Sequence, residues 1–321
     1  MLEKHDLNSL IELIINNINR NFLLCYHNLI SKSIIINYFS TMTINKLTFK
    51  IINICIIFLL LNSCDKGHEL SNSGYLNLSF CANNEYIGED ISILTFNRLN
   101  KTSISSVSEV FEKLNPDIVG LQESYDVGLQ IADRFEYCFY GSKDASISIL
   151  SKYPIEDIND SYCKIHLNDS LYINFFNVHL PAYPYQPYDI RDTLITTPNQ
   201  AIHQAEQTRG TQVNVLLELI NSIENTMPMI LVGDFNEPSH LDWVMGSENA
   251  QSFQYNNANQ FIVDWPTSNK LLNINFIDVY RALFPDPLLF PGYTWSTMNT
   301  LKEVHDRIDF VYYQGKDIIN L

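Results

Sequence analysis

The chain has 321 residues, of which 20 are Lys or Arg and 36 are Asp or Glu, giving a formal net charge of −16 at pH 7. This length suits one substantial layered domain behind a leader segment. The acidic balance disfavours tight, non-specific binding of duplex nucleic acid, because such binding depends on basic side chains that neutralise phosphates.

At the N-terminus, residues 1–41 are rich in Ile, Asn and Leu and contain no usable motif. We interpret them as an upstream extension that forms no domain, with translation starting at Met42. A genuine N-terminal domain is the alternative interpretation.

Residues 42–64 have the pattern of a bacterial lipoprotein signal peptide. Basic residues precede the apolar run 51–61, which is too short to cross a bilayer and is therefore typical of a secretory signal. Leu61 and Ser63 before Cys64 resemble a lipobox. We therefore expect the mature protein to be exported and attached to a bacterial membrane through a lipidated Cys64.

Residues 65–85 are expected to form a tether between the lipid and the domain, although 75–81 can also be read as an initial strand. Three further cysteines follow, namely Cys81, Cys138 and Cys163. Their odd number and wide spacing disfavour a disulfide framework or a zinc cluster. One bridge can form in an oxidising compartment, but buried thiols are the default expectation.

Two apolar stripes at helical spacing predict helices that cover a core. The first stripe ends ahead of the Asn115-Pro116-Asp117 break, and the second stands just before a predicted strand. The first consists of Val107, Val110, Phe111 and Leu114, and the second of Val213, Leu216, Leu217, Ile220 and Ile223.

Five strand-like apolar segments carry polar residues at or just beyond one end. Open α/β sheets place ligands beyond their strand ends, so these residues can meet although they are scattered along the chain. Any one of them alone favours a structural role such as a capped turn, whereas five together favour a site. The segments are 91–96 before Asn97, 118–121 before Gln122 and Glu123, 172–176 before Asn177 and His179, 229–232 before Asp234 and Asn236, and 307–313 with Asp309.

These motifs, in this order, resemble the endonuclease/exonuclease/phosphatase superfamily of metal-dependent phosphohydrolases over residues 88–315. The superfamily includes pancreatic-type deoxyribonucleases, abasic-site endonucleases, neutral sphingomyelinases and inositol polyphosphate 5-phosphatases. The resemblance is carried by Thr95-Phe96-Asn97, Leu121-Gln122-Glu123, Asn177-Val178-His179-Leu180, Gly233-Asp234-Phe235-Asn236 and Asp306-Arg307-Ile308-Asp309.

The resemblance implies a fold and a set of roles for the domain at 86–321. The fold is a four-layer α/β/β/α sandwich of two mixed β-sheets flanked by helices. Glu123 and Asn97 would bind Mg²⁺ or Mn²⁺, since hard oxygen donors suit a hard cation. Asp234 would activate the attacking water, and Asn236 and His179 would donate hydrogen bonds to phosphate oxygens.

Structural interpretations compete with several of these roles. Asn97 can cap a turn, and His179 lies between apolar residues where a core histidine is common. Arg307 can simply pair with a carboxylate. His240 and His305 lie near motifs and are interpreted as structural.

Asp309 departs from the superfamily pattern. The resemblance implies that this catalytic aspartate pairs with the histidine of a terminal Ser-Asp-His segment, and no such segment follows Asp309 in this sequence. His305 is a poor substitute, because four residues along one strand separate the two by about 13 Å. We therefore expect the last strand to be missing and the domain to be C-terminally incomplete, with an exposed sheet edge.

From these observations we predict a monomeric, lipid-anchored phosphoester hydrolase acting on a small or lipid-headgroup phosphodiester or phosphomonoester. After Cys64 the chain holds 15 basic and 33 acidic residues, a formal charge of −18. A secreted nuclease of the same fold is one alternative, since a local basic patch or bound divalent ions can offset a negative field. A catalytically inactive surface lipoprotein is the other. Aromatic residues in 183–188 and 243–295 can line a pocket or be buried under an insertion.

Overall fold

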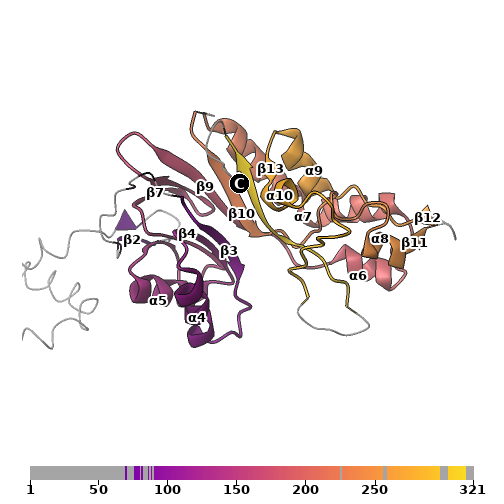
Figure 1. Cartoon of the computed structure of the whole chain (residues 1–321), viewed down its shortest axis with the longest axis horizontal. Coiled ribbons are helices and arrows are strands. Elements are labelled where there is room, and N and C mark those ends of the chain that lie inside the picture. Colours follow the sequence, from indigo (N-terminus) through magenta and orange to yellow (C-terminus); the bar gives the residue numbers. More distant parts are fainter. Residues whose placement is uncertain are drawn as a thin grey trace, which may run out of the picture. The chain divides into compact units, whose positions relative to one another are not determined.

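Two six-stranded mixed β-sheets form the centre of the domain (Figure 1). The computed structural model describes residues 69–70, 76–79, 81, 86, 88, 90–224, 226–255, 259–296 and 303–315. In spatial order, sheet A consists of β1 (Glu69–Leu70), β2 (Leu76–Ser79), β5 (Cys138–Gly141), β6 (Ile147–Ser151), β4 (Ile118–Gln122) and β3 (Ile93–Asn97). Sheet B consists of β13 (Ile277–Asp278), β14 (Asp309–Gln314), β10 (Met229–Asp234), β9 (Tyr172–His179), β8 (Tyr162–His166) and β7 (Ile155–Asn159).

Helices cover the outer faces of both sheets. Those after sheet A strands are α4 (Ile104–Leu114) and α5 (Tyr125–Phe135). Against sheet B lie α7 (Pro198–Ser222), α9 (Pro266–Asn273) and α10 (Val279–Leu283). The short helices α6 (Gln186–Arg191) and α8 (Glu248–Ser252) belong instead to a separate hydrophobic cluster with the start of α7. A separate hairpin of β11 (Gln254–Tyr255) and β12 (Asn259–Gln260) lies near α8.

Three hydrophobic clusters fill the spaces between these layers. The first lies between the sheets and joins Ile118 of β4 to Phe175 of β9. The second packs Val107 of α4 and Ile131 of α5 against sheet A, and the third packs Val213 of α7 against sheet B. The predicted four-layer α/β/β/α sandwich is therefore confirmed.

Both predicted helical stripes lie on core-facing helices. In α4, the Ser103 side chain accepts a hydrogen bond from the Ser106 amide at the start, and Asn115 in the left-handed conformation ends the helix. The predicted core position of Leu114 is wrong, because its side chain is exposed at the last turn.

The N-terminal predictions lie mostly outside the described residues. Residues 1–41, the signal at 42–64 and Cys64 are among those not described. Within the described residues, no helix is long and apolar enough to cross a membrane. The tether predicted over 65–85 stays a prediction; of the two interpretations of 75–81, the strand is confirmed, because β2 pairs with β5 along its whole length and belongs to sheet A.

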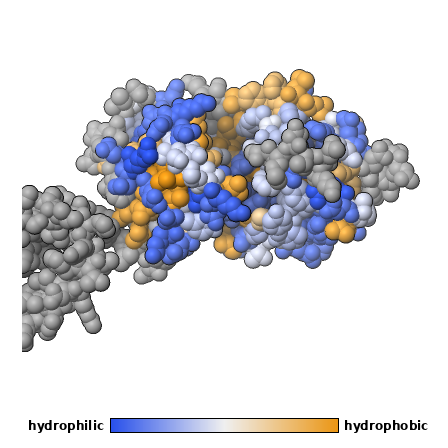
Figure 2. Space-filling view, turned by 90° about the horizontal axis from the view of Figure 1, so that it is seen from below, coloured by the Kyte–Doolittle hydropathy of each residue, from blue (hydrophilic) through white to orange (hydrophobic). Residues whose placement is uncertain are grey.

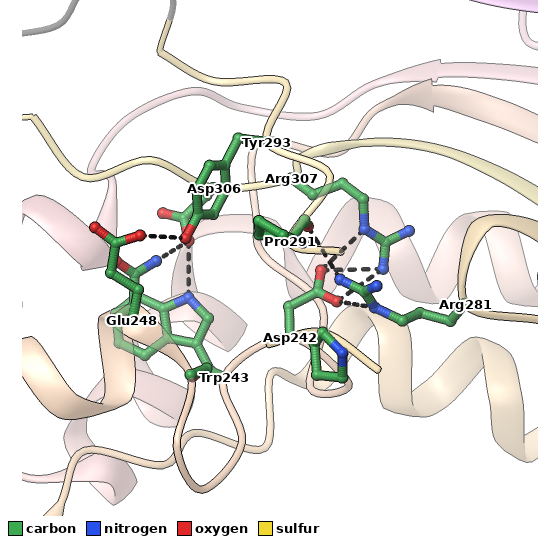
Figure 3. A pocket seen from close by; sticks show the side chains of 11 residues that line it. Asp242, Trp243, Glu248, Arg281, Pro291, Tyr293, Asp306 and Arg307 are labelled. Carbon is green, nitrogen blue, oxygen red and sulfur yellow. Dashed lines mark hydrogen bonds and ion pairs between the residues drawn. The ribbon is translucent and has the colours of Figure 1, made fainter. Parts of the chain in front are cut away.

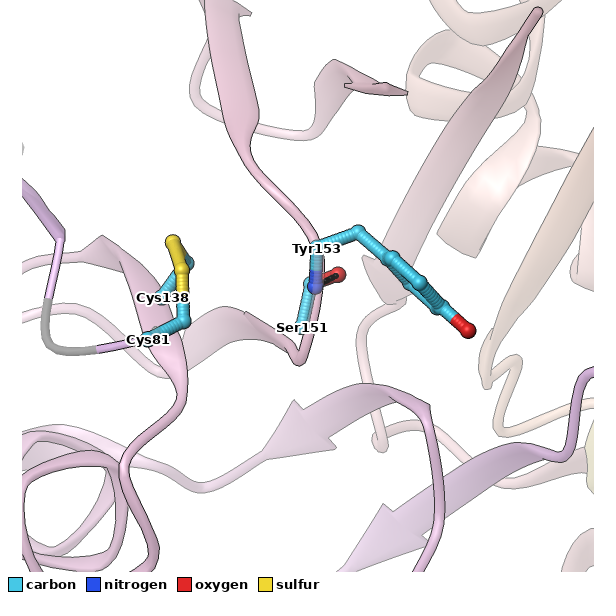
Figure 4. The surroundings of a disulfide bond; sticks show 4 residues. All are labelled: Cys81, Cys138, Ser151 and Tyr153. Carbon is cyan, nitrogen blue, oxygen red and sulfur yellow. Dashed lines mark hydrogen bonds between the residues drawn. A yellow bond between two sulfur atoms is a disulfide. The ribbon is translucent and has the colours of Figure 1, made fainter. Parts of the chain in front are cut away.

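A disulfide joins Cys81 to Cys138, with their Cα atoms 4.7 Å apart (Figure 4). The prediction of buried thiols is wrong for this pair. Cys81 lies two residues beyond Ser79, which pairs directly with Cys138 in the sheet, so β-pairing brings the two sulfur atoms together. Cys163 is a buried thiol, as predicted.

Strand β3 is an edge of sheet A. Its five residues are all half-buried, whereas the five residues of the adjacent β4 are fully buried. Within the described residues no strand pairs with the outer side of β3. The expectation of a missing last strand stays a prediction, because residues 316–321 lie outside the described part of the chain.

The two sheets approach each other closely at Gly120. A Cβ atom at this position would lie 2.3 Å from Val232 Cγ2 and 2.9 Å from Asn177 Oδ1, both in sheet B. Across the same contact, Gln122 Nε2 donates to Asn177 Oδ1 (2.7 Å), and Asn177 Nδ2 donates to the Leu121 carbonyl (3.2 Å). The two side-chain N–H groups thus find partners across the contact, whereas Gln122 Oε1 is buried and has no hydrogen-bond partner among the described residues.

We predict that Gly120→Ala destabilises the protein by about 1–3 kcal/mol, because the added methyl group overpacks a rigid contact between two strands. Thermal or urea unfolding would measure the change. The matched control is Gly210→Ala in α7, where the added Cβ meets the flexible end of Glu206. This variant should be neutral or more stable by roughly 0.5–1 kcal/mol, since alanine favours helix. Equal effects at both positions would contradict the sheet-contact argument.

Candidate active site

Three predicted residues lie in one row across sheet B. His179 at the end of β9 is the register partner of Asp234 at the end of β10, and Asp234 is the partner of Asp309 at the start of β14. Residues paired across neighbouring strands project from the same face. His179 Nε2 lies 3.8 Å from Asp234 Oδ2. Strand register therefore brings together three of the residues named from the sequence.

Sheet A contributes two further residues to the same place. Asn97, the last residue of β3, donates from Nδ2 to Asp234 Oδ2 (2.8 Å) and lies 3.5 Å from Glu123 Oε1. Glu123 directly follows β4, and its Oε2 accepts a hydrogen bond from the backbone N–H of Asn100. The predicted metal ligands Asn97 and Glu123 are thus neighbours, and Asn97 joins them to Asp234.

The turn after β10 fixes the orientation of Asp234. Gly233 has φ +151°, and a Cβ atom there would lie 2.1 Å from the Val178 carbonyl oxygen, so this position requires glycine. The backbone N–H of Asn236 donates to Asp234 Oδ1 (2.8 Å). Asn236 Nδ2 donates to the Leu180 carbonyl (2.9 Å), which uses one of its two N–H groups and ties the turn to the end of β9.

Burial and neighbouring charges set the acidity of the two aspartates. Burial raises the pKa of Asp234, and the negative charge of Glu123 adds to this effect, while His179, Asn97 and Asn236 oppose it. Burial and the charge of Asp234 together raise the pKa of Asp309 to about 7. Asp309 Oδ1 is buried and accepts no hydrogen bond from the described residues. The row therefore holds two carboxylates that disfavour each other's ionisation.

The residues interpreted as structural do have structural contacts. Arg307 binds Asp278 through two hydrogen bonds of 2.7 and 2.8 Å and also contacts Asp242, as Figure 3 shows in part. The competing interpretation of Arg307 as a carboxylate partner is therefore confirmed. His240 contacts Ser268, and His305 contacts the Ser296 carbonyl.

The tryptophans of the long insertion are mostly buried. Trp243 and Trp265 have no exposed surface and pack edge to face at 5.2 Å. Trp243 Nε1 donates to Asp306, whose pKa burial raises to about 6 (Figure 3). Burial under the insertion accounts for Trp265, whereas Trp243 is buried and also lines the pocket drawn in Figure 3.

A buried ion pair behind the site was not identified from the sequence. Arg209 of α7 and Glu237 are each 1% exposed in their side chains, and Arg209 Nη1 lies 3.8 Å from Glu237 Oε2. Arg209 Nε also donates to the Pro181 carbonyl (3.0 Å). Since Pro181 follows His179 closely and Glu237 follows Asn236, Arg209 holds together the two loops that leave the site.

A signal for this ion pair exists in the sequence. The second predicted stripe extends toward the start of α7 through the buried residues Ala201, Ala205 and Arg209. An arginine on the buried face of a helix requires a partner, because an unpaired buried charge is costly. Continuing the stripe from Val213 toward the N-terminus, as far as Arg209, would have predicted a buried ion pair.

The donor set fits a hard divalent cation. The side chains that converge here offer carboxylate and amide oxygen atoms, and Mg²⁺ binds through one or two carboxylates while keeping several waters. No group of three or more His, Cys, Asp or Glu side chains forms a metal cluster in the described part of the chain. Glu123, half-buried at the site, is the carboxylate best placed for one metal contact.

We predict that Arg209→Met destabilises the protein by about 3–5 kcal/mol, because it leaves the Glu237 charge buried without its partner. Chemical unfolding would measure the loss. The control is Arg134→Met, which breaks an exposed pair with Glu112 and should cost no more than about 1 kcal/mol. Adding Glu237→Gln to Arg209→Met should recover part of the lost stability; no recovery would argue against the pair.

We predict that the difference in free energy of unfolding between Asp309→Asn and the wild type grows in favour of the variant as pH rises from about 4 to 8. The pKa of Asp309 in the folded protein is about 7, above its ordinary value of 3.8, so its stabilising contribution is present at low pH and is lost as pH rises through 7. The gain should be on the order of 2–4 kcal/mol at pH 8 and vanish near pH 4. Urea unfolding with a chelator, and exposed Asp144→Asn as control, would test this. A pH-independent difference would contradict the assignment.

Comparison with known proteins identifies the family of the chain. An uncharacterized protein of Caenorhabditis elegans is 28% identical over 255 residues, covering 70% of this chain and 79% of the relative. TDP2 from the same organism has 16% identity and a TM-score of 0.44, covering 72% of this chain and 65% of that one. An AP endonuclease from Archaeoglobus fulgidus has 17% identity and a TM-score of 0.44, covering 70% of this chain and 86% of that one. The Endonuclease/Exonuclease/phosphatase family matches residues 77–319, and the chain belongs to this family.

Proposed function

We propose that this protein is an exported, metal-dependent phosphoester hydrolase acting on a small or lipid-headgroup phosphodiester or phosphomonoester. The observation that carries the proposal is the contact of Asn97 in sheet A with Asp234 in sheet B, beside Glu123 and His179. Strand ends from two sheets thus present carboxylate, amide and imidazole groups together. Family membership supports phosphoester hydrolysis.

In this proposal Glu123 and Asn97 hold Mg²⁺ or Mn²⁺. The cation, when bound, polarises the phosphoryl group and neutralises developing charge. The positions of these residues support the assignment, because one follows β4 and the other ends β3, two adjacent parallel strands. The Asn97 amide also donates to Asp234, which keeps the ligand and the base at a constant separation.

Asp234 orients the attacking water and accepts its proton. Its two oxygen atoms receive hydrogen bonds from Asn97 Nδ2 and the Asn236 amide, which fix the plane of the carboxylate. Burial raises its pKa and so makes the carboxylate a better proton acceptor than an exposed aspartate. A positioned general base needs both properties.

His179 and Asn236 donate to phosphate oxygens that gain charge in the transition state. His179 is partly exposed, with 17% of its side chain accessible, so its imidazole can reach a ligand. Asn236 keeps one N–H group beyond the one bound to Leu180. Asp309 is the register partner of Asp234 at the start of β14, so its carboxyl group lies beside the proposed base and forms part of the proposed site.

The acidic surface favours a small or headgroup-sized substrate over duplex nucleic acid. The residues after Cys64 carry a formal charge of −18, which repels a polyanion. Nuclease activity is the second candidate, because the family to which the chain belongs, Endonuclease/Exonuclease/phosphatase, includes nucleases by its description. A monomer is the proposed working state.

Export is supported by the Cys81–Cys138 disulfide. Structural disulfides form and persist in oxidising compartments outside the cytosol. The predicted signal at 42–64 and the lipidation site at Cys64 agree with such a location.

We predict that the full chain hydrolyses bis-p-nitrophenyl phosphate with Mg²⁺ or Mn²⁺ and loses this activity in a chelator. Asp234→Asn should lower kcat by about 10²–10⁴-fold, because it removes the general base while keeping the shape of the side chain. Exposed Asp133→Asn in α5 is the control and should retain full activity. Release of p-nitrophenol measures the rate.

Two outcomes would favour the alternatives. Cleavage of plasmid DNA that falls steeply with salt would favour a nuclease. A folded protein with no turnover of any phosphoester in any divalent cation would favour the non-catalytic lipoprotein. Unchanged activity in Asp234→Asn would contradict the assignment of the base.

A further inference from the structure

Apolar surface is concentrated on one loop of the domain. On the face shown in Figure 2, hydrophobic side chains gather in patches within a largely hydrophilic surface. Six of the fifteen exposed large hydrophobic side chains in the described residues belong to 283–293, which we call the apolar loop. They are Leu283, Phe284, Leu288, Leu289, Phe290 and Tyr293. Such a concentration marks an interaction surface, whereas scattered single residues do not.

The loop is held rigidly from within by one buried arginine. Arg281 donates from Nη1 to the carbonyls of Phe284 (3.0 Å) and Phe290 (2.7 Å), and from Nη2 to that of Pro291 (3.0 Å). Its Nε binds Asp242 at 2.6 Å, as Figure 3 shows. The exposed side chains are therefore presented by a fixed backbone.

Part of the loop backbone is also satisfied without water. Asp286 Oδ1 accepts hydrogen bonds from the amides of Leu288 and Leu289, and the Asp286 carbonyl accepts one from Phe290. Pro285, Pro287 and Pro291 have no N–H group to satisfy. A loop that enters a lipid interface must bind its own polar groups, because unsatisfied ones are costly there.

The C-terminal end of the loop adjoins the proposed site. Thr294, directly after the loop, accepts hydrogen bonds at Oγ1 from the backbone amides of Ile308 (3.1 Å) and Asp309 (3.2 Å). The loop is therefore connected to the start of β14, where Asp309 begins the row with Asp234 and His179.

We propose that the apolar loop inserts into the interface of a zwitterionic lipid bilayer and presents the active site to it. Between 283 and 293 there is no Lys or Arg, and the one acidic side chain binds the loop itself, so insertion requires no anionic lipid. Aliphatic side chains with a neighbouring tyrosine are typical of interfacial insertion. Six half-exposed side chains offer a few hundred Å², less than the roughly 800 Å² per partner of a stable protein interface.

This inference extends the proposed function, because it makes a lipid headgroup the substrate class nearest to the site. A single weak anchor gives only marginal membrane binding, and stable attachment takes two signals. The apolar loop would be the second signal beside the predicted lipid at Cys64.

Tryptophan quenching in vesicles tests the proposal on the full chain. The reporter is Leu288→Trp, and the control is Leu114→Trp at the end of α4; both leucines are 52% exposed. Leu114 precedes β4, whereas Glu123 follows it, so the control lies at the opposite end of that strand from the site. Phosphatidylcholine vesicles with brominated acyl chains should quench the Leu288→Trp variant more than the wild type, relative to unbrominated vesicles. Leu114→Trp should match the wild type.

Equal quenching of the two variants, or none beyond the wild-type level, would overturn the proposal. Circular dichroism verifies folding, and Leu289→Trp, at a leucine 71% exposed, serves as a second reporter if the first variant misfolds. Dimerisation that Leu289→Asp abolishes, without quenching of either reporter, would identify a second copy as the occupant instead. Quenching requires no turnover, so loss of the proposed hydrolase activity and loss of insertion are separate results.

Discussion

The close approach of the two sheets at Gly120 is the constraint on which the active site depends. Because this position has no side chain, Gln122 Nε2 can donate to Asn177 Oδ1, and Asn177 Nδ2 can donate to the Leu121 carbonyl across the gap between the sheets. Glu123 directly follows Gln122, and His179 lies two residues after Asn177. The amide contact therefore fixes the position of Glu123 relative to His179. A shift of β4 or β9 along its own direction would separate these two residues.

Much of the site could be predicted because it follows from strand ends. An apolar run predicts a buried strand, and the polar residue after it lies at the edge of the sheet. This reasoning located Asn97, Glu123, His179 and Asp234, and the observed register brings them together. It could not establish which strands are neighbours, since pairing between distant segments leaves no local pattern. The family resemblance supplied that information for the two-sheet fold.

Two features needed information that a local pattern does not contain. The Cys81–Cys138 disulfide depends on the pairing of β2 with β5, so widely spaced cysteines alone could not reveal it. Arg209 of α7 binds the backbone of Pro181, which lies 28 residues earlier in the sequence. The sequence indicates this role only through the place of Arg209 on a buried helical face. Sequence motifs do not reveal side chains that bind the backbone of distant segments, because such contacts depend on the fold and not on a local pattern.

The disulfide also determines how mechanical load passes through the molecule. It closes a covalent ring between Cys81 and Cys138, and this ring contains Asn97 and Glu123 but not His179 or Asp234. Force applied to the chain before Cys81 can be transmitted covalently through the disulfide to β5, without passing along the chain through β3 and β4. In a protein held at its N-terminal end under flow, the covalent segment that carries Asn97 and Glu123 would therefore lie outside the path of the force.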